Sequence, residues 1–379
     1  MVCHSQISTI DADSQEADNC KYLMIKSLKV ENFRCFDTLA LSDFRRVNII
    51  VGQNAAGKTA LLEAIRLALG GTPQVALALN NNRGIPYVGI AQTRDQFEAL
   101  WNSLFYKYEA KRTISTEIHD SGGQSATLKI SYDPAKSVTP SQLVQPNSAP
   151  STIIPVKFER SSFAGELSTL YGTVLPQGQG QINLEGGAEL GLAIEFFASS
   201  WLLNSQQNAQ WFSQLSLENR EREVVDAVKK EFDPMITDMQ VLSLTQFMPG
   251  AVYATVPFIS SKIPLSLLSA GITKFFTILS AILYRRHGVV LIDEVENGLY
   301  YGRLRALWQT LLRLAKENDT QLFVSTHSYE CLQALLPMIA GNEEDFTLLR
   351  AERSNGSSKI SQFSGKDFEA ALAIRGEVR

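Results

Sequence analysis

The chain has 379 residues, and its 35 lysines and arginines against 39 aspartates and glutamates give a formal net charge of −4. This balance argues against a protein that binds nucleic acid through an overall excess of basic residues, because such binding depends on Lys and Arg that displace counterions from phosphates. With 45% hydrophobic and 20% charged residues, the composition excludes a disordered or collagen-like chain.

The cysteines and the apolar runs indicate the compartment. The four cysteines show no CxxC spacing, so we predict neither a disulfide framework nor a zinc site. No apolar run approaches the roughly 20 residues of a membrane span, and the longest, 272–284, is interrupted by Lys274. Residues 1–23 contain acids and no apolar segment of a signal peptide, so we expect a disordered leader. We therefore expect a cytoplasmic protein with no membrane partner.

The first predicted elements are strands that lead into a glycine-rich loop. Apolar residues spaced as in strands occupy 25–36 and 39–41, and residues 47–51 form a short β-branched run that ends at a glycine. Residues 60–69 are strong helix formers and stop at Gly70 and Gly71. The first unit is therefore a strand, a glycine loop and a helix.

The middle of the chain is predicted to change from strands to helices. Alternating stretches at 113–118 and 126–132 flank a glycine-containing turn and predict a β-hairpin. Residues 133–155 are rich in Pro, Ser and Gln and predict a linker. We expect helices from near Leu190 to about Phe232.

Beyond that helical region, strands and helices are predicted to alternate. Strands are expected at 239–244, 251–257, 288–292 and 321–325, helices from about 271 and at 302–316, a hairpin around Asn355 and Gly356, and a last helix at 366–373. We divide the chain into an N-terminal lobe at 24–189, an inserted helical lobe at 190–260 and a C-terminal lobe at 261–379.

The loop at 52–59 matches the phosphate-binding motif G-x-x-x-x-G-K-[ST] at every position. Its glycines allow backbone N–H groups to surround a phosphate at a helix N-terminus, Lys58 neutralises the β- and γ-phosphates, and the Thr59 hydroxyl reaches Mg²⁺. A chance match in a glycine-rich turn is the competing interpretation, and the strand before the loop and the helix after it argue against that. The residues predicted to contact the nucleotide here are Asn54, Ala55, Ala56, Gly57, Lys58, Thr59 and Ala60.

Two adjacent acids follow the predicted strand at 288–292. Asp293 and Glu294 stand at the carboxyl end of that strand, where open α/β sheets bind ligands. Asp293 is predicted to hold Mg²⁺ through water and Glu294 to polarise the attacking water as general base. Seen alone, the pair could equally be a solvated turn.

His327 ends a further buried strand, at the same kind of position as the two acids. A lone histidine is usually structural, but at this strand end it can hydrogen-bond a γ-phosphate and sense its loss.

Ser269 and Gly271 open the helix that precedes the Asp293 strand. A serine and a glycine at a helix N-terminus form an anion site, and ordinary N-capping is the competing explanation. Both interpretations require the same geometry, because a helix cap that faces another subunit can also hold that subunit's phosphate.

The order of these motifs resembles that of ABC-type ATPases of the SMC/RecF class. Within that class the chain is similar to the stand-alone, OLD-like AAA ATPases often encoded with bacterial anti-phage and abortive-infection systems. The similarity rests on residues 28–36, the stretch 291–298, the Ser-Thr-His-Ser sequence at 325–328 and the terminal residues 375–379. It covers roughly 24–379 and is weakest at 75–190. It implies an α/β, P-loop ABC-type ATPase head with a mixed sheet and an inserted helical lobe.

The resemblance also implies cofactors and roles. ATP and Mg²⁺ are expected, with Lys58, Glu294 and His327 catalytic, and Thr59 and Asp293 at the metal. A glutamine that bridges Mg²⁺ and the γ-phosphate is expected between the phosphate loop and the helical lobe, and its positional candidates are Gln92, which we favour, and Gln96. Arg34 is expected either to touch nucleotide or DNA or to be a plain surface residue.

The resemblance further implies a head-to-head dimer. Ser269 and Gly271 match the signature segment that reaches the partner's nucleotide, although the sequence here is Leu-Leu-Ser-Ala-Gly-Ile-Thr. Asn297 and Gly298 occupy the place of a loop that contacts the partner subunit. About 210 residues without heptads separate Thr59 from Ser269, so no long coiled-coil arm is expected. Only 52 residues follow His327, which leads us to expect any nuclease activity on another chain.

Three functions are compatible with these motifs. The favoured one is a homodimeric ATPase switch that controls a separate effector, such as a nuclease, in anti-phage defence. The second is a RecF-like DNA-repair ATPase that binds DNA across its dimerised heads. The third is a scaffold in which ATP holds an oligomer together with little turnover.

Overall fold

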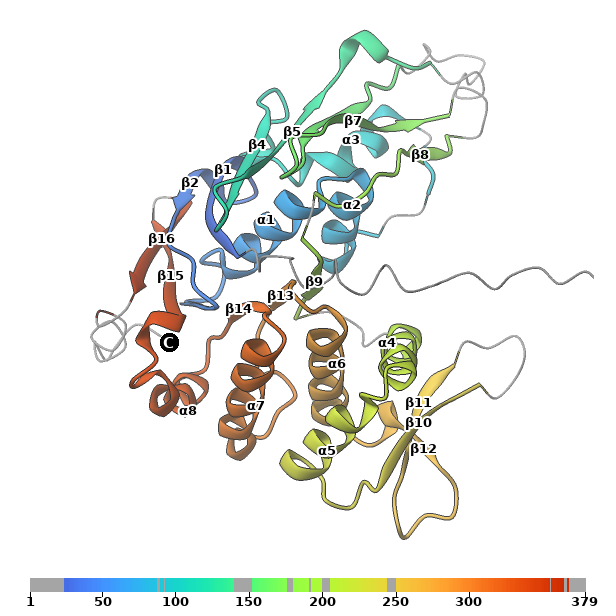
Figure 1. The fold of residues 1–379 in the computed structure, drawn as a ribbon. Helices are drawn as coiled ribbons and strands as arrows, with labels where there is room; N and C mark the ends of the chain where they lie inside the picture. Colours follow the sequence, from blue (N-terminus) through green and yellow to red (C-terminus); the bar gives the residue numbers. More distant parts are fainter. Residues whose placement is uncertain are drawn as a thin grey trace, which may run out of the picture.

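The computed structural model describes most of the chain, and its ribbon is drawn in Figure 1. The described residues are 24–86, 89–91, 93–139, 152–175, 180–190, 192–199, 205–243, 250–354, 356–364 and 367. The predicted leader at 1–23, the Gln92 candidate and all but one residue of the predicted last helix lie outside these ranges.

A mixed sheet forms the centre of the described structure. Its strand order is β16 (Ser357–Ser364), β15 (Phe346–Ser354), β3 (Val47–Gly52), β14 (Gln321–Ser325), β13 (Val289–Ile292) and β9 (Ile194–Phe197). The strands from β15 to β9 are parallel, and β16 is antiparallel to β15. The prediction of an α/β fold with a mixed sheet is therefore confirmed, and so is the hairpin around residue 356.

The parallel strands are apolar on both faces because each face lies under a separate hydrophobic core. In β3, Ile49 and Val51 pack into one core and Ile50 into the other. A strand covered on both sides has no solvent-facing positions, so its sequence is a continuous apolar run. This explains why the short apolar runs at 47–51, 288–292 and 321–325 were predicted correctly as strands.

A second, antiparallel sheet covers one face of the structure (Figure 1). Within the described ranges its order is β2 (Phe36–Leu41), β1 (Ile25–Phe33), β4 (Ile114–Asp120), β5 (Ser125–Tyr132), β6 (Val156–Ser161), β7 (Leu167–Val174) and β8 (Ile182–Leu184). The predicted hairpin is β4 and β5.

Strands β6 to β8 were not predicted, and in β6 Arg160 disguises the pattern. It occupies an inward-facing position of β6, where an apolar residue is the usual signal of a strand. Its guanidinium instead donates to the carbonyl of Ala188 (2.7 Å) and, through Nε, to Ser168 Oγ (2.8 Å).

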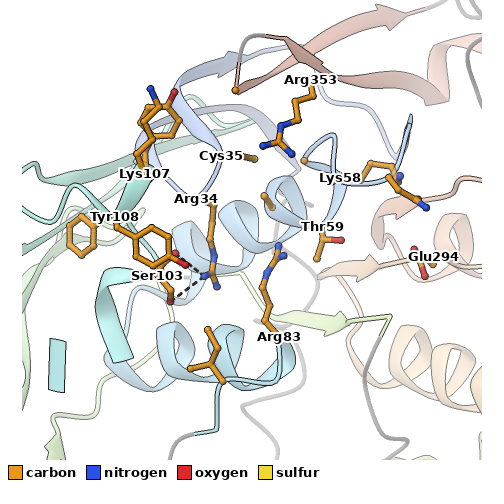
Figure 2. A pocket seen from close by; sticks show the side chains of 18 residues that line it. Arg34, Cys35, Lys58, Thr59, Arg83, Ser103, Lys107, Tyr108, Glu294 and Arg353 are labelled. Atoms are coloured by element: carbon orange, nitrogen blue, oxygen red, sulfur yellow. Dashed lines mark hydrogen bonds between the residues drawn. The ribbon is translucent and has the colours of Figure 1, made fainter. Parts of the chain in front are cut away.

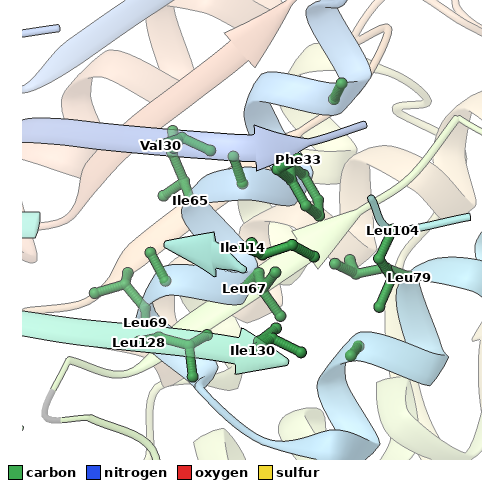
Figure 3. Packing of buried hydrophobic residues seen from close by; sticks show 14 of the residues in the cluster. Val30, Phe33, Ile65, Leu67, Leu69, Leu79, Leu104, Ile114, Leu128 and Ile130 are labelled. Carbon is green, nitrogen blue, oxygen red and sulfur yellow. The ribbon is translucent and has the colours of Figure 1, made fainter. Parts of the chain in front are cut away.

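Helix α1 (Lys58–Gly70) lies between the two sheets, and Figure 3 shows its apolar side chains against the antiparallel sheet. Ile65, Leu67 and Leu69 pack with residues of β1, β4 and β5 in one buried cluster. Helices α2 (Pro73–Asn82) and α3 (Arg94–Asn102) extend this cluster. The N-terminus of α1 is thus fixed at the end of β3, directly after the phosphate loop.

The other face of the central sheet is covered by helices (Figure 1). These are α4 (Ser205–Leu217), α5 (Glu221–Glu231), α6 (Ala270–Tyr284), α7 (Leu304–Glu317) and α8 (Tyr329–Ile339). A small sheet of β10 (Asp238–Leu242), β11 (Ala251–Thr255) and β12 (Ile263–Pro264) lies beside α4.

The expectation of helix from near Leu190 was wrong over its first part. Residues 194–197 form β9, which pairs in parallel with β13 at the edge of the central sheet. A short apolar run does not reveal by periodicity whether it is a strand or a buried helix turn, and only the long-range pairing settles it. The segment 190–260 therefore supplies a strand to the central sheet before α4 and α5 begin.

No helix in the described part of the chain combines the length and the apolar character that a bilayer crossing requires.

The buried face of α1 leads to a stability prediction. Leu67 is fully buried, and Leu67→Ala is expected to lower the free energy of unfolding by about 2–5 kcal/mol because it leaves a cavity between α1 and the antiparallel sheet. The matched control is Leu217→Ala, since Leu217 is 79% exposed and its truncation is expected to cost less than about 0.5 kcal/mol. Urea unfolding of both variants checks this, and equal losses would contradict the packing.

Candidate active site

A cavity of about 740 Å³ opens over the N-terminus of α1, and Figure 2 shows the side chains that line it. Its size lies within the range of about 300–1,000 Å³ that is usual for cofactor sites. Of the predicted nucleotide-binding residues it is lined by Asn54, Ala55, Gly57, Lys58, Thr59 and Ala60, whereas Ala56 is buried.

The shape of the phosphate loop depends on its glycines. Gly52 has φ +138°, and a Cβ there would lie 2.1 Å from the carbonyl oxygen of Ala351. Gly57 has φ +110°, and a Cβ there would lie 3.1 Å from both Cys35 Sγ and Ser358 Oγ. Side chains at these two positions would therefore meet the β15–β16 hairpin as well as strained backbone.

Lys58 is almost fully buried at the base of the cavity. Its Nζ donates to the carbonyls of Gly52 (2.7 Å) and Gln53 (3.0 Å). Burial lowers the pKa of Lys58, and the charges of Asp293 and Glu294 oppose that shift. The ammonium group is thus held inside the loop, where it can meet a phosphate oxygen.

The strand order brings the three predicted motifs together. Strand β14 lies between β3 and β13, so all three end at the same edge of the sheet. Thr59 Oγ1 donates to Asp293 Oδ2 (2.8 Å), and Ser325 Oγ donates to Asp293 Oδ1 (2.5 Å). One buried carboxylate therefore links the loop after β3 to the end of β14.

The donor set around Asp293 suits Mg²⁺. This ion prefers oxygen ligands and is usually held by one or two protein groups together with substrate phosphates and waters. Thr59 and Asp293 present a hydroxyl and a carboxylate in direct contact. Within the described ranges, no group of three or more His, Cys, Asp or Glu side chains is placed to hold a metal ion. An ion at Asp293 would therefore also need phosphate oxygens and waters as ligands. The site therefore fits an ion that arrives with a nucleotide.

Glu294 lines the cavity and is held by contacts at its backbone and its carboxylate. Its φ is +49°, which is uncommon outside glycine and typical of functional positions. Its N–H donates to Ser325 Oγ (2.8 Å), and Lys274 Nζ donates to its carbonyl (2.6 Å). Asn297 Nδ2 donates to Glu294 Oε2 (2.5 Å). The carboxylate is therefore oriented at the cavity wall.

His327 lies beside two carboxylates. Its Nδ1 is 3.2 Å from Glu296 Oε1 and 3.7 Å from Glu294 Oε1. The same Glu296 oxygen accepts from the backbone N–H groups of His327 (2.9 Å) and Ser328 (3.2 Å). Glu296 thus fixes the start of the loop that carries His327.

Ser269 and Gly271 stand at the start of α6 (Ala270–Tyr284). Ser269 Oγ accepts from the N–H of Ile272 (3.0 Å) and caps α6. A Cβ at Gly271 would lie 2.5 Å from the carbonyl oxygen of Gly298. Neither is among the described residues that line the cavity. One chain brings the phosphate loop, Asp293, Glu294 and His327 together, but not the signature segment.

The remaining candidates have different outcomes. Gln92 lies outside the described residues. Gln96 is exposed in the first turn of α3 and does not line the cavity. Arg34 is not a plain surface residue: it is among the residues that line the cavity, and its side chain is 8% exposed. Its Nε donates to Glu63 Oε2 (3.1 Å) and its Nη2 to Asn80 Oδ1 (2.9 Å). Its contact with nucleotide or DNA stays a prediction.

Sequence reasoning missed Ser325, Glu296 and Lys274. Ser325 was visible as the first polar residue after the apolar run of β14. Lys274 interrupts the apolar run at 272–284, and Glu296 is a third acid shortly after Asp293 and Glu294. A charged group in such a position needs a partner. Their contacts depend on how β13, β14 and α6 pack against one another, and a local sequence pattern does not predict that packing.

Comparisons with known proteins agree with this geometry. Residues 27–168 match the family model of an AAA domain, and residues 204–332 match that of an AAA domain described as a putative AbiEii toxin of a type IV TA system. An ATP/GTP phosphatase of Helicobacter pylori is 24% identical over 85% of this chain and 90% of its own length. The protein is an ATPase.

Shorter and structural likenesses accompany these matches. The DNA replication and repair protein RecF of Idiomarina loihiensis is 49% identical to this ATPase over 12% of the chain and 13% of its own length. The crystal structure of an SMC head bound to the C-winged helix domain of ScpA is matched with a TM-score of 0.46 at 12% identity, over 91% of this chain and 99% of that one.

The contact between Lys274 and Glu294 leads to a pH prediction. Burial lowers the pKa of Lys274 from 10.5 to about 8, and the charges of Glu296 and Glu294 oppose that shift. Below pH 8 the folded protein therefore bears the cost of a buried ammonium group, and that cost disappears between about pH 8 and 10.5, where only the unfolded chain keeps the proton. The melting temperature of wild type relative to Lys274→Met is expected to rise over this range.

Thermal unfolding at several pH values checks this, with Lys230→Met as control because the Lys230 side chain is 81% exposed. A difference between wild type and Lys274→Met that stays constant from pH 7 to 10 would contradict the burial of a charged amine there.

Proposed function

We propose that this ATPase is a homodimeric switch: two chains close on Mg-ATP, and hydrolysis opens them. Its output is control of a separate effector protein, such as a nuclease, in defence against phage. ATP bound between two chains interacts with the closed state more than with the open one, and such a difference is what a ligand-driven switch requires.

The observation that carries this proposal is that the start of α6 does not line the cavity. Lys58, Thr59 and Glu294 line it, while the capped N-terminus of α6 at Ser269 does not. A helix N-terminus carries partial positive charge and unpaired N–H groups, which suit an anion. A second copy of the chain would bring its own Ser269 and Gly271 to the open side of the cavity.

The chemistry proposed for the site is hydrolysis of the β–γ phosphate bond. Lys58 and the loop N–H groups would bind the β- and γ-phosphates, and Thr59 and Asp293 would hold Mg²⁺, which neutralises phosphate charge when bound. Glu294 would accept the proton of the attacking water. His327, held by Glu296 on one side, would donate to the γ-phosphate.

The packing around α6 supports a connection between hydrolysis and dimer opening. Lys274 of α6 donates to the carbonyl of Glu294, and Gly271 at the start of α6 lies against the backbone of Gly298. A change at Glu294 on loss of the γ-phosphate would therefore reach the segment that faces the partner through two direct contacts.

The defence role is supported by the match to an AAA domain described as a putative AbiEii toxin. Plating of phage on bacteria that carry the gene with its neighbours tests it. Protection is expected with wild type and not with Lys58→Ala, and equal plating on both strains would contradict the role.

Glu294→Gln tests the switch directly. The glutamine keeps the shape of the side chain but cannot take a proton, so we expect the hydrolysis rate to fall by about 10²–10⁴-fold. The uncleaved ATP should hold two chains together, and the solution mass measured by light scattering with Mg-ATP should double.

The control for this measurement is Glu294→Gln combined with Lys58→Ala, which is expected to stay at the mass of the nucleotide-free protein because it lacks the phosphate-binding ammonium group. Full hydrolysis by Glu294→Gln, or a mass that does not respond to ATP, would refute the switch.

The local identity to RecF favours a second candidate, a DNA-repair ATPase that binds DNA across the dimerised heads. It predicts duplex DNA binding that appears only with ATP and weakens steeply with salt, because phosphate contacts release counterions. Fluorescence anisotropy of labelled DNA between 50 and 200 mM salt, spanning roughly the range over which such binding weakens, checks it.

A further inference from the structure

We propose that a pocket between the end of β9 and the flank of α6 is a second anion site, which binds inorganic phosphate. The pocket is separate from the nucleotide cavity and contains Lys274, a cation without a counter-ion. This inference rests on the proposed function in one respect, since hydrolysis at the neighbouring cavity is expected to supply the phosphate.

The pocket has a volume of about 220 Å³ and is formed by three segments of the chain. These are residues 197–199 after β9, the residues Ala270, Lys274, Thr277 and Ile278 of α6, and the loop residues Asn297 and Gly298. The pocket is smaller than the roughly 300 Å³ at which sites for drug-sized ligands begin, so a small ion with its waters suits it better than a nucleotide.

The ammonium group of Lys274 is poorly compensated. Its Nζ donates to the carbonyl oxygen of Glu294 (2.6 Å), and within the described ranges it forms no ion pair. An ammonium group has three N–H donors, and a charge removed from water needs a counter-ion or several hydrogen bonds. Burial accordingly lowers the pKa of Lys274 to about 8. An anion in the pocket would supply both the charge and the missing acceptors.

The neighbouring carboxylates are held by other donors. Glu294 Oε2 accepts from Asn297 Nδ2, and Glu296 Oε1 accepts from the backbone N–H of His327. Their charges act on Lys274 only from a distance. No acidic side chain is among the described residues that line the pocket, and Lys274 is the one charged residue among them.

The donors around the pocket suit a tetrahedral oxyanion. Lys274 contributes the N–H groups that it does not give to Glu294. Asn297 Nδ2 gives one N–H to Glu294 and keeps a second, and Ser199 adds a hydroxyl at the pocket wall. Phosphate can accept from all three directions at once, and its bond to an ammonium group is charge-assisted.

The position of the pocket connects it to hydrolysis. Glu294 lines the nucleotide cavity, while its carbonyl is bound by Lys274 from the pocket. Phosphate in the pocket would also lie against Asn297 and Gly298, the loop expected to contact the partner subunit. The pocket would thus retain the product beside the segment whose movement the proposed switch requires.

The binding test uses Lys58→Ala as background, because that substitution removes the ammonium group of the phosphate loop. Isothermal titration of inorganic phosphate into Lys58→Ala is expected to show one site. Adding Lys274→Met is expected to weaken this binding by about 10-fold or more, because the charged donor is lost. Adding Lys230→Met instead is the matched control and is expected to change nothing, since the Lys230 side chain is 81% exposed.

A second variant closes the pocket without removing the charge. Ala198→Leu adds apolar volume to the pocket wall and leaves the contact of Lys274 with Glu294 in place, so it is also expected to abolish phosphate binding. Thermal unfolding monitors the fold of each variant. If Lys274→Met does not fold, Ala198→Leu decides the question.

A kinetic test distinguishes phosphate from solution and phosphate released by hydrolysis. In a single turnover of wild type, free phosphate followed with a fluorescent phosphate sensor is expected to lag behind ATP cleavage followed by rapid quenching. In Ala198→Leu the lag, measured against that variant's own cleavage rate, is expected to disappear. An equal lag in both proteins would overturn the capture of product phosphate.

The outcomes separate this inference from the proposed function. Phosphate binding to Lys58→Ala that survives both Lys274→Met and Ala198→Leu would overturn the site, and so would its absence in Lys58→Ala alone. In either case ATP hydrolysis by wild type would still uphold the proposed function. A wild type that binds phosphate through Lys274 but does not hydrolyse ATP would refute the proposed function and leave the anion site standing.

Discussion

The hydrogen bonds to Asp293 are the contact on which the site depends. They join Thr59 after β3, Ser325 at the end of β14 and the carboxylate at the end of β13. The two hydroxyl donors come from segments more than two hundred residues apart along the chain, and the carboxylate holds both. A carboxylate that is almost buried needs hydrogen-bond donors. The strand order brings these donors to Asp293, and without them the buried carboxylate would destabilise that strand order.

The edge where these strands end is asymmetric, and the asymmetry is informative. The residues of the predicted phosphate loop and Glu294 line the cavity, whereas Ser269 and Gly271 at the start of α6 are not among the described residues that line it. Lys274 and the Gly271–Gly298 contact connect the two regions through α6. In the proposed switch, a change at Glu294 would reach the start of α6 through these contacts.

The sequence was sufficient where structure is local. The loop at 52–59, the buried strands with continuous apolar runs and the acids after β13 were all predicted. The conformation of each depends on residue types that are neighbours in the sequence. The prediction failed where long-range pairing decides, as in β9, and where a charged residue faces inward, as with Arg160 in β6. Arg34 shows the same limit: only the fold reveals that Glu63, a charge in an apolar helix, is its partner.

The phosphate loop lies against a hairpin from the far end of the chain. The carbonyl oxygen of Ala351 lies 2.1 Å from the place that a Cβ on Gly52 would take, and the side chain of Ser358 lies beside Gly57. During synthesis the loop leaves the ribosome early, yet the hairpin that surrounds it leaves almost three hundred residues later. The loop therefore lacks part of its surroundings until the β15–β16 hairpin has been synthesised, so a nascent chain that stops short of this hairpin cannot hold the loop as the folded protein does.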